Sequence, residues 1–386
     1  MKRSRQIALL TAALALVLAT FGLGYEVEQA DFERILPLYT VAFGAYFFLL
    51  WKVERIRTIK LLLILAVAMR VLLVFSIPSL SDDIYRFVWD GRLWLNGINP
   101  FNHLPRAVLD FQPLPEGLTP ELFAQLNSPD YFTIYPPVAQ GIFVLASWIS
   151  PQSVWGSAVV MKVFLLACEI GSLFLLVRLL KAFQLPEKNV LFYALNPLLI
   201  VEIMGNLHFE GAMIFFFLLA FWGLVRQKYS LSAIAFALSI ASKLLPLMFL
   251  PFLLRRLGWK RSFRYFSILG VSLILLFFPL FNGVFLQNFG DSLNLYFQKF
   301  EFNASVYYIV RWIGFQIKGY NLIAVWGPRL AFGTFLGIIV LVIYEKKLDW
   351  KRLPQQLLWS ISLYLLFTTT VHPWYITPMI AFLPFT

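Results

Sequence analysis

The sequence predicts an all-α protein that is embedded in a lipid bilayer through most of its length, and three observations support this. Hydrophobic residues make up 60% of the chain and charged residues only 13%, whereas soluble domains contain roughly 25% charged residues. Apolar runs of about 20 residues, long enough to cross a bilayer core, recur from Ile7 to the end of the chain. The 40 Phe and 12 Trp suit a lipid-facing surface with aromatic belts. We therefore expect a single polytopic membrane domain over residues 1–386.

The net charge of +12 does not indicate a nucleic-acid partner, because the basic residues lie in short clusters between the apolar runs. Six clusters hold most of the 32 Lys and Arg residues. Cytoplasmic loops of membrane proteins carry an excess of Lys and Arg, so we expect all six clusters in the cytoplasm. They are Lys2–Arg5, Lys52–Lys60, Arg178–Lys188, Arg226–Lys228, Arg255–Arg264 and Lys346–Arg352.

Alternating these clusters across the membrane predicts about 11–13 transmembrane helices, with the N-terminus in the cytoplasm. The first run is expected to be an uncleaved anchor, because no cleavage pattern stands directly before a polar stretch. The last run stops within apolar sequence at Phe382–Thr386, so we expect a fragment that lacks further C-terminal helices. The expected crossings are about 7–24, 35–51, 60–77, 154–180, 189–204, 209–225, 230–242, 244–257, 265–282, 322–344, 355–371 and 374–386.

Two large extracytoplasmic loops are expected, over residues 78–153 and 283–321. Each contains an apolar stretch, 134–150 and 304–317, that must not cross the membrane if the basic clusters are to stay in the cytoplasm. We expect both stretches to be helices that lie on the outer surface. The runs 230–242 and 244–257 are too short for two ordinary spans, which favours a broken helix pair at a protein-lined cavity.

The segment Ser81–Arg92 directly follows the third expected crossing and carries two adjacent acids. Ser81 or Asp82 would cap a new helix, whose dipole favours acids in the first turn. At helical spacing Asp82, Arg86 and Asp90 share one face, which allows ion pairs. One interpretation is an amphipathic surface helix with a capped start. The other is that a carboxylate at this membrane exit acts as a general base.

Three further segments place polar side chains near the membrane, where such groups are costly. Glu202 lies in an apolar run after the helix-kinking Pro197, and His208 and Glu210 follow in a short outer turn. These could be a satisfied buried acid and a solvated loop, and their spacing is not that of a convincing metal site.

The other two segments are centred on Lys243 and His372. Lys243 stands alone between two apolar half-helices and needs water or an anion such as a phosphate, unless it only extends its ammonium to the interface. His372 precedes Pro373 at a helix end, which is also typical of an aromatic belt with a helix stop.

Several functional classes lack their motifs in this sequence. It contains no phosphate-binding Gly-rich loop, no Gly-x-Ser-x-Gly and no Cys/His cluster of metal-ligand spacing. An ATP-driven pump and a soluble-type hydrolase are therefore not expected. We predict no cofactor, and the sequence leaves open whether a divalent cation takes part.

Taken together, these segments resemble the GT-C superfamily of membrane glycosyltransferases, which use polyprenyl-phosphate sugars as donors. The resemblance is to bacterial mannosyltransferase-like members, and its motifs run in the expected order over about residues 78–376. The motifs are Ser81–Gly91 with Gly97–Pro100, Ile134–Pro137, Asn196–Glu210, Phe302–Ser305 and His372–Tyr375.

The resemblance implies a catalytic base in the first outer loop, which falls on Asp82 with Asp83 adjacent. It implies a second acidic motif that falls on Glu210, where related sequences often have Asp. The extra helix pair before the first outer loop also departs from the simplest plan of this superfamily. We expect substrate to be bound by Tyr85, Arg86, Asp90, Glu202, His208, Lys243 and His372.

The implied reaction moves a sugar, expected to be mannose, from a polyprenyl phosphate to a lipid-linked or glycan acceptor. Direct attack by the acceptor hydroxyl would invert the anomeric carbon, and a cation such as Lys243 or Arg86 would stabilise the departing phosphate. We expect this site on the extracytoplasmic face of a bacterial plasma membrane.

Two other classes remain as alternatives. A lipid-linked-glycan transporter or flippase would carry charges along a path through the membrane, and an O-antigen-type ligase or polymerase would have arginine-rich outer loops. The expected topology instead gathers the charged candidates on one face and leaves few outer arginines, which favours the transferase.

Overall fold

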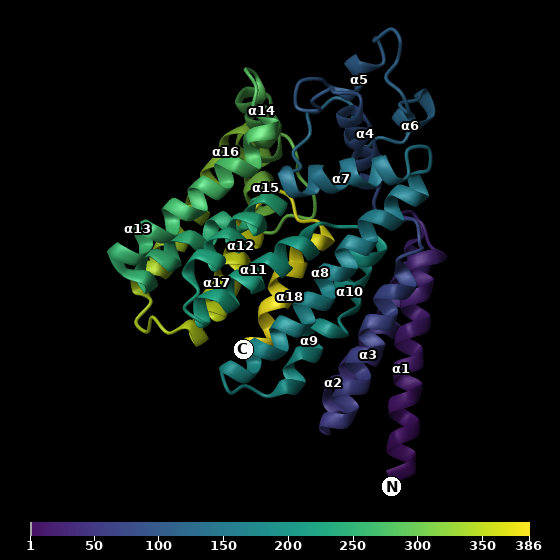
Figure 1. Cartoon of the computed structure of the whole chain (residues 1–386), viewed down its shortest axis with the longest axis vertical. Helices are drawn as coiled ribbons and strands as arrows, with labels where there is room; N and C mark the ends of the chain where they lie inside the picture. Colours follow the sequence, from purple (N-terminus) through teal and green to yellow (C-terminus); the bar gives the residue numbers. More distant parts are fainter. Residues whose placement is uncertain (1) are drawn as a thin grey trace.

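The computed structural model describes the backbone of residues 2–386, and their side chains except those of residues 2, 3, 293 and 296–298. Helices dominate these residues, and β pairing is confined to an isolated bridge between Phe302 and Thr370. The expected all-α membrane fold is confirmed, because six helices are long and apolar enough to cross a membrane. Figure 1 shows helices of residues 2–75 at one side of the molecule and those of residues 250–344 at the other, with shorter helices of the central chain between them.

The first three helices are α1 (Lys2–Tyr25), α2 (Phe32–Lys52) and α3 (Ile56–Leu73), and all three are of spanning length. They lie side by side at one edge of the molecule (Figure 1), with many apolar side chains exposed to the surroundings, such as Leu10. Gly24 lets α1 approach α3 closely, because a Cβ there would lie 2.3 Å from the side chain of Leu73. The α1–α3 unit therefore packs against its own helices while presenting an apolar outer surface, as lipid contact requires.

Residues 78–153, where the sequence predicts the first outer loop, form α4 (Asp83–Leu95), α5 (Pro105–Val108), α6 (Pro120–Ala124) and α7 (Pro137–Ile149). Helices α4 and α7 are in close contact at Gly91, where a Cβ would lie 2.4 Å from the carbonyl oxygen of Phe143. With 13 residues, α7 is about 20 Å long and too short to cross a core of about 30 Å. Figure 1 shows it running across the bundle, at a steep angle to α1–α3.

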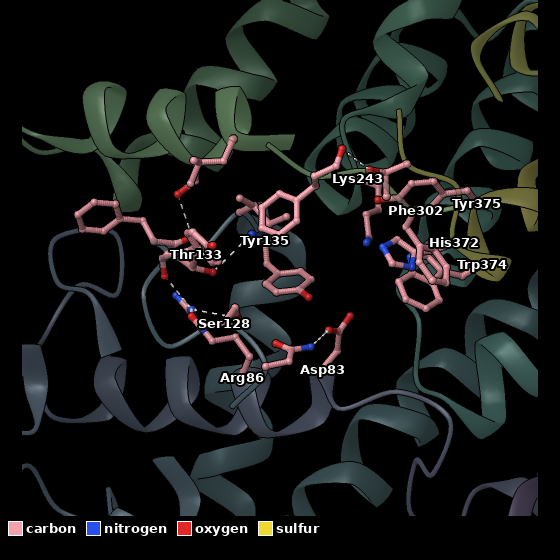
Figure 2. Close-up of a pocket in the computed structure, with 18 of the residues that line it drawn as sticks. Asp83, Arg86, Ser128, Thr133, Tyr135, Lys243, Phe302, His372, Trp374 and Tyr375 are labelled. Carbon is pink, nitrogen blue, oxygen red and sulfur yellow. Dashed lines mark hydrogen bonds between the residues drawn. The ribbon is translucent and has the colours of Figure 1, made fainter. Parts of the chain in front are cut away.

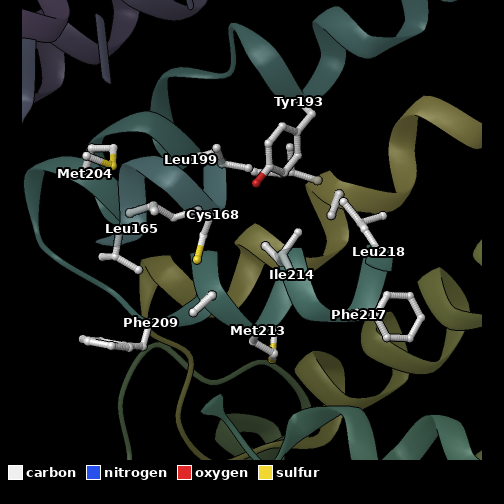
Figure 3. Packing of buried hydrophobic residues seen from close by; sticks show 14 of the residues in the cluster. Leu165, Cys168, Tyr193, Leu199, Met204, Phe209, Met213, Ile214, Phe217 and Leu218 are labelled. Atoms are coloured by element: carbon white, nitrogen blue, oxygen red, sulfur yellow. The ribbon is translucent and has the colours of Figure 1, made fainter. Parts of the chain in front are cut away.

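The central part of the chain consists of α8 (Val154–Ala182), η1 (Glu187–Val190), α9 (Leu191–Ala194), α10 (Pro197–Ile200), the π-helix η2 (Val201–Gly205) and α11 (Glu210–Val225). The expected crossing at 189–204 is thus several short pieces rather than one helix. Pro197 starts α10 after Asn196, whose side chain caps it by accepting from the backbone N–H of Leu199. The α10–η2 piece and α11 meet at a bend of 111°. Apolar residues of α8–α11 form the core around Cys168 and Tyr193 (Figure 3).

The helix break expected near residue 243 is confirmed. Helix α12 (Tyr229–Ser242) ends at Lys243, whose backbone is extended, and the 3₁₀ helix η3 (Leu245–Phe249) follows. Helix α13 (Leu250–Phe277) then bends at Gly258, whose φ of 69° favours glycine. This bend lies within the basic cluster Arg255–Arg264, where the sequence predicted a cytoplasmic loop.

The C-terminal part consists of η4 (Phe278–Leu280), α14 (Phe285–Gln298), α15 (Val306–Lys318), α16 (Ile323–Tyr344), η5 (Trp350–Arg352), α17 (Leu353–Phe367), η6 (Pro373–Ile376), α18 (Thr377–Phe382) and η7 (Leu383–Phe385). Helix α15 has 13 residues and is also too short for an ordinary span. Of the described residues, only six helices reach spanning length, or seven if the bent pair counts as one span. This is fewer than the 11–13 expected, because the structure divides several apolar runs into shorter helices such as α12 and α18.

Candidate active site

Two adjoining cavities lie where the segment of residues 78–153 meets the helix break at Lys243. The first has a volume of about 390 Å³ and many polar lining residues, and the second has about 420 Å³ and mostly apolar ones. We call them the polar cavity and the apolar cavity. Both are lined by Ile134, Tyr135, Lys243, Thr370 and Tyr375, so these residues form the boundary between them.

The start of α4 places one carboxylate at the polar cavity. Asp83 lines this cavity, and its Oδ1 accepts a hydrogen bond of 2.9 Å from Asn127 Nδ2. Asp82 holds the N-cap position but makes no capping hydrogen bond, is exposed and lines neither cavity. Partial burial and the adjacent charge of Asp83 raise the pKa of Asp82. Of the two acids singled out by the sequence, the structure brings Asp83 to the cavity.

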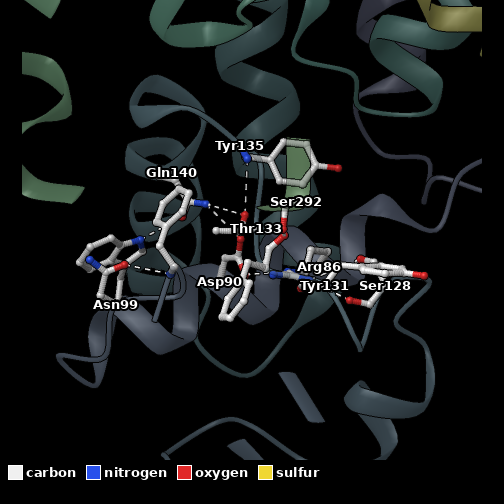
Figure 4. A network of polar contacts seen from close by, with 12 residues as sticks. Arg86, Asp90, Asn99, Ser128, Tyr131, Thr133, Tyr135, Gln140 and Ser292 are labelled. Carbon is white, nitrogen blue, oxygen red and sulfur yellow. Dashed lines mark hydrogen bonds and ion pairs between the residues drawn. The ribbon is translucent and has the colours of Figure 1, made fainter. Parts of the chain in front are cut away.

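Arg86 and Asp90 form a buried polar network behind the cavity wall (Figure 4). Arg86 Nε donates to Asp90 Oδ1 at 2.8 Å, and Nη1 donates to the carbonyl oxygens of Ser128 and Tyr131. The other oxygen of Asp90 accepts from Gln140 on α7 at 3.0 Å. The Arg86 charge is thus already paired, and it holds the 128–131 segment in place as one wall of the cavity.

Tyr85 and Asp90, both expected to bind substrate, line neither cavity. Asp90 is fully buried, while Tyr85 is half-buried and packs against the hydrophobic core. Arg86 does line the polar cavity, but its hydrogen bonds go to the protein.

The π-helix η2 and the turn after it place His208 between Glu202 and Asp83. The turn includes Leu207 with a φ of 65°, an uncommon conformation for a side chain of this kind. His208 Nδ1 lies 3.1 Å from Glu202 Oε2 and 3.1 Å from the Glu202 carbonyl oxygen. His208 Nε2 lies 3.9 Å from Asp83 Oδ2. Asn206 donates to Glu202 Oε2 at 3.2 Å, so the oxygen that faces His208 is held by a second residue.

Lys243 and Glu210 form an ion pair at the boundary between the cavities. Lys243 Nζ lies 3.1 Å from Glu210 Oε1, and the other oxygen of Glu210 is buried without a hydrogen-bond partner in the part of the chain described. The ammonium also lies 5.5 Å from the centre of the Tyr135 ring, within the range of a cation–π contact. Lys243 is the group that both cavities share and that carries a positive charge.

Four aromatic rings form a stack beside the polar cavity, and three of them line it, whereas His208 lies behind Trp374 and lines neither cavity. The ring centres of His208 and Trp374 are 4.0 Å apart, those of Trp374 and His372 are 4.4 Å apart, and those of His372 and Phe302 are 5.1 Å apart. Figure 2 shows Phe302, His372 and Trp374 on the side opposite Arg86. Burial lowers the pKa of His372, so its ring favours the neutral form.

Sequence reasoning did not single out several residues of this site. Asn127, Ser128 and Tyr131 come from an ordinary polar loop segment, and no local pattern marks them. Glu301 lines the polar cavity and contacts Arg311 at 3.2 Å. Trp374 lies within a motif that the resemblance used, but its stacking on His208 depends on the fold.

A second group of missed residues lies inside the apolar helices. Arg70 on α3 pairs with Glu169 on α8 at 2.8 Å, and the hydroxyl of Tyr193 donates to the same carboxylate at 2.5 Å. Lys162 Nζ donates to the carbonyl oxygens of Leu73 and Ser76 at the end of α3. Charges within apolar runs would have been the signal to find them.

The described residues contain no group of three or more His, Cys, Asp or Glu side chains placed to hold a metal ion. The ionisable side chains at and beside the two cavities are carboxylates, two histidines, one arginine and one lysine.

Comparison with known proteins gives two matches. The family model described as "Alpha-(1->6)-mannopyranosyltransferase, N-terminal domain" matches residues 8–257. Alpha-(1->6)-mannopyranosyltransferase B of Corynebacterium glutamicum is 25% identical over 158 residues, which cover 38% of this chain and 24% of that relative. The matched part is thus about a quarter of the relative's own length. The family match includes Asp83, Glu202, His208, Glu210 and Lys243, whereas the aromatic residues Phe302, His372 and Trp374 lie beyond it.

Proposed function

The chain belongs to the alpha-(1->6)-mannopyranosyltransferase family of GT-C mannosyltransferases, and from this premise we propose that it transfers a mannosyl residue from a polyprenyl-phosphate donor to a hydroxyl of a glycan or lipid-linked acceptor. One observation carries the proposal. A polar cavity that contains Asp83 adjoins an apolar cavity, and Lys243 stands at their common boundary. A substrate with an apolar chain, a phosphate and a sugar fits this arrangement, with the chain in the apolar cavity, the phosphate beside Lys243 and the sugar in the polar cavity.

The donor's lipid would occupy the apolar cavity. Its wall includes Met213, Leu244, Leu247, Met248 and Pro378, which offer apolar contact to an isoprenoid chain. The phosphate would then lie beside Lys243, where a charge-assisted hydrogen bond is available. Glu210 keeps the ammonium paired before the donor binds, so the phosphate competes with this carboxylate for Lys243.

The acceptor hydroxyl would approach from the polar cavity. Asp83 takes its proton while the acceptor oxygen bonds to the anomeric carbon, and the bond from that carbon to the phosphate oxygen breaks. A single displacement of this kind inverts the anomeric centre. The departing phosphate carries the electron pair and is stabilised by Lys243. We assign the base to Asp83 rather than Asp82 because Asp83 alone of the two lines the cavity.

We also propose that the two cavities face the extracytoplasmic side of a bacterial plasma membrane. The basic clusters support this orientation, because cytoplasmic loops carry the excess of Lys and Arg. In intact cells, an impermeant thiol reagent should label a cysteine at position 103 and not at position 260. The native Cys168 is buried, so its background labelling should be low. Labelling of position 260 but not 103 would reverse the topology.

The function itself is tested with purified protein and three donors. Polyprenyl-phosphate mannose, glucose and arabinose are supplied in turn with a mannosyl acceptor, and sugar transfer is measured with a labelled donor. We expect transfer from the mannose donor, since the family is one of mannosyltransferases. Preferential transfer from another donor would replace mannose as the proposed sugar. Transfer from none of the three donors would contradict the proposal.

A further inference from the structure

His208 presents a buried, unpartnered nitrogen to the carboxylate that we propose as the base. Its side chain is only 1% exposed, and Nε2 has no hydrogen-bond partner among the described residues. This nitrogen lies 3.9 Å from Asp83 Oδ2. Buried polar atoms without a partner are rare in folded proteins and call for an explanation.

The protonation of His208 follows from what surrounds its other nitrogen. Nδ1 faces two acceptors at 3.1 Å, the carboxylate and the backbone carbonyl of Glu202. Both can only accept, so Nδ1 carries the hydrogen. With its hydrogen on Nδ1, the ring can hold a lone pair on Nε2, the nitrogen that lies 3.9 Å from Asp83 Oδ2.

The ring is also fixed in direction. Trp374 stacks on it with ring centres 4.0 Å apart, and Asn206 donates to the same Glu202 oxygen that contacts Nδ1. Such support keeps an imidazole in one orientation, as carboxylates do for histidines in hydrolytic sites. The gap of 3.9 Å is longer than a hydrogen bond, but catalytic hydrogen bonds are often long without substrate and shorten when it binds.

We propose that Glu202, His208 and Asp83 form a proton relay, in which His208 receives through Asp83 the proton of the acceptor hydroxyl. This inference rests on the proposed glycosyl transfer. The acceptor oxygen bonds to the anomeric carbon, the lipid phosphate leaves with the electron pair, and the hydroxyl proton passes from the Asp83 carboxylate to Nε2. The imidazolium then lies between two carboxylates, and after the product leaves it returns the proton through Asp83, which lines the polar cavity, to water there before the next cycle.

The relay explains why a histidine stands behind the carboxylate. An ordinary imidazole binds a proton more tightly than an ordinary carboxylate, with pKa values of about 6.5 and 3.9. A sugar hydroxyl is a weak acid, so a base coupled to imidazole removes its proton more readily than an isolated Asp. The charge of Glu202 stabilises the imidazolium once it has formed.

Kinetics of two substitutions test the relay with purified full-length chain. His208→Gln keeps a polar amide at the site but cannot take up a proton, and we expect kcat to fall about 10- to 100-fold with the donor KM within about twofold. Glu202→Gln should lower kcat in the same direction. Because Glu202 acts through His208, the double variant should lose little more than His208→Gln alone. A matched control is His103→Gln, a half-buried histidine outside both cavities, which should keep wild-type kcat.

The outcomes separate the relay from the proposed function. If the wild type transfers mannose and folded His208→Gln keeps more than half of its kcat, the relay is wrong and the transferase stands. If the wild type transfers no sugar, both fall. Additive losses in the double variant would also overturn the relay, since the two residues would then act independently.

A spectroscopic measurement covers the case in which a variant does not fold. The chain has only three histidines, so ¹⁵N-histidine labelling gives a spectrum that can be assigned by replacing His103 and His372. The relay requires that His208 at rest carries its hydrogen on Nδ1, beside Glu202, and none on Nε2. A ring protonated on Nε2 could not receive a proton from Asp83 and would overturn the relay.

Discussion

This protein contains two sets of charged side chains, and they differ in whether their charges remain available to a ligand. The set inside the helices, Arg70, Glu169 and Lys162, is fully buried and bonded to protein oxygens or to one another. The set at the cavities, Asp83 and Lys243 among others, borders open space. Charges that the protein has satisfied hold helices together, whereas charges at a cavity remain able to act on a ligand.

The largest expected effect separates the adjacent carboxylates at the start of α4. Asp83→Asn should lower kcat about 10²- to 10⁴-fold, the usual contribution of a positioned base. Asp82→Asn is the matched control, because it removes the same charge at the exposed N-cap position, where Asn serves about as well as Asp. Initial rates of mannosyl transfer measure both variants. Similar losses in the two would show that charge at the helix start matters rather than a base in the cavity.

Substitution in the buried pair of Arg70 and Glu169 should lower the stability of the protein rather than its kcat. Glu169→Gln leaves the Arg70 guanidinium buried with its counter-charge removed, which typically costs about 3–5 kcal/mol. We expect a clearly lower thermal midpoint in detergent, with nearly normal kcat per folded molecule. Replacing Arg70 by Met in the same chain should recover much of the loss, because no unpaired charge remains. A loss of kcat at full stability would instead connect this pair to the chemistry.

Lys243 is expected to act on donor binding. Lys243→Gln should raise the donor KM about tenfold, equivalent to roughly 1.4 kcal/mol, with a smaller change in the acceptor KM. Steady-state titration of each substrate separates the two. An unchanged donor KM would mean that Lys243 only pairs with Glu210.

The smallest effect is expected at Tyr85. Its hydroxyl lines neither cavity, so Tyr85→Phe should leave the KM of both substrates within about twofold. A tenfold change in either KM would show that Tyr85 contributes to substrate binding, as the sequence predicted.

Local sequence features predicted the parts of the fold that depend on local chemistry. The apolar runs and basic clusters gave the membrane class, Ser81 and Asp82 marked the start of α4, and the isolated Lys243 marked the helix break. Pro197 likewise indicated the kink that begins α10. Each of these features changes the cost of continuing a helix at that residue, so each can be identified without the rest of the chain.

Other features depend on contacts between distant segments and could not be predicted. Neighbouring helix residues point about 100° apart, so the rotation of α4 against α7 decides whether Asp82 or Asp83 faces the cavity. The pairing of Arg70 with Glu169 requires α3 beside α8. The π-helix η2, which delivers His208 to Asp83, left no pattern that we could identify in the sequence.

A structure with the donor bound tests the central claim most directly, namely that Lys243 marks the boundary between lipid and sugar. We predict that a non-transferable polyprenyl-phosphate mannose analogue, seen by cryo-electron microscopy, places a phosphate oxygen about 2.7–2.9 Å from Lys243 Nζ. The chain should lie in the apolar cavity and the sugar in the polar cavity, facing Asp83. A phosphate held elsewhere, with Lys243 still paired to Glu210, would contradict the account.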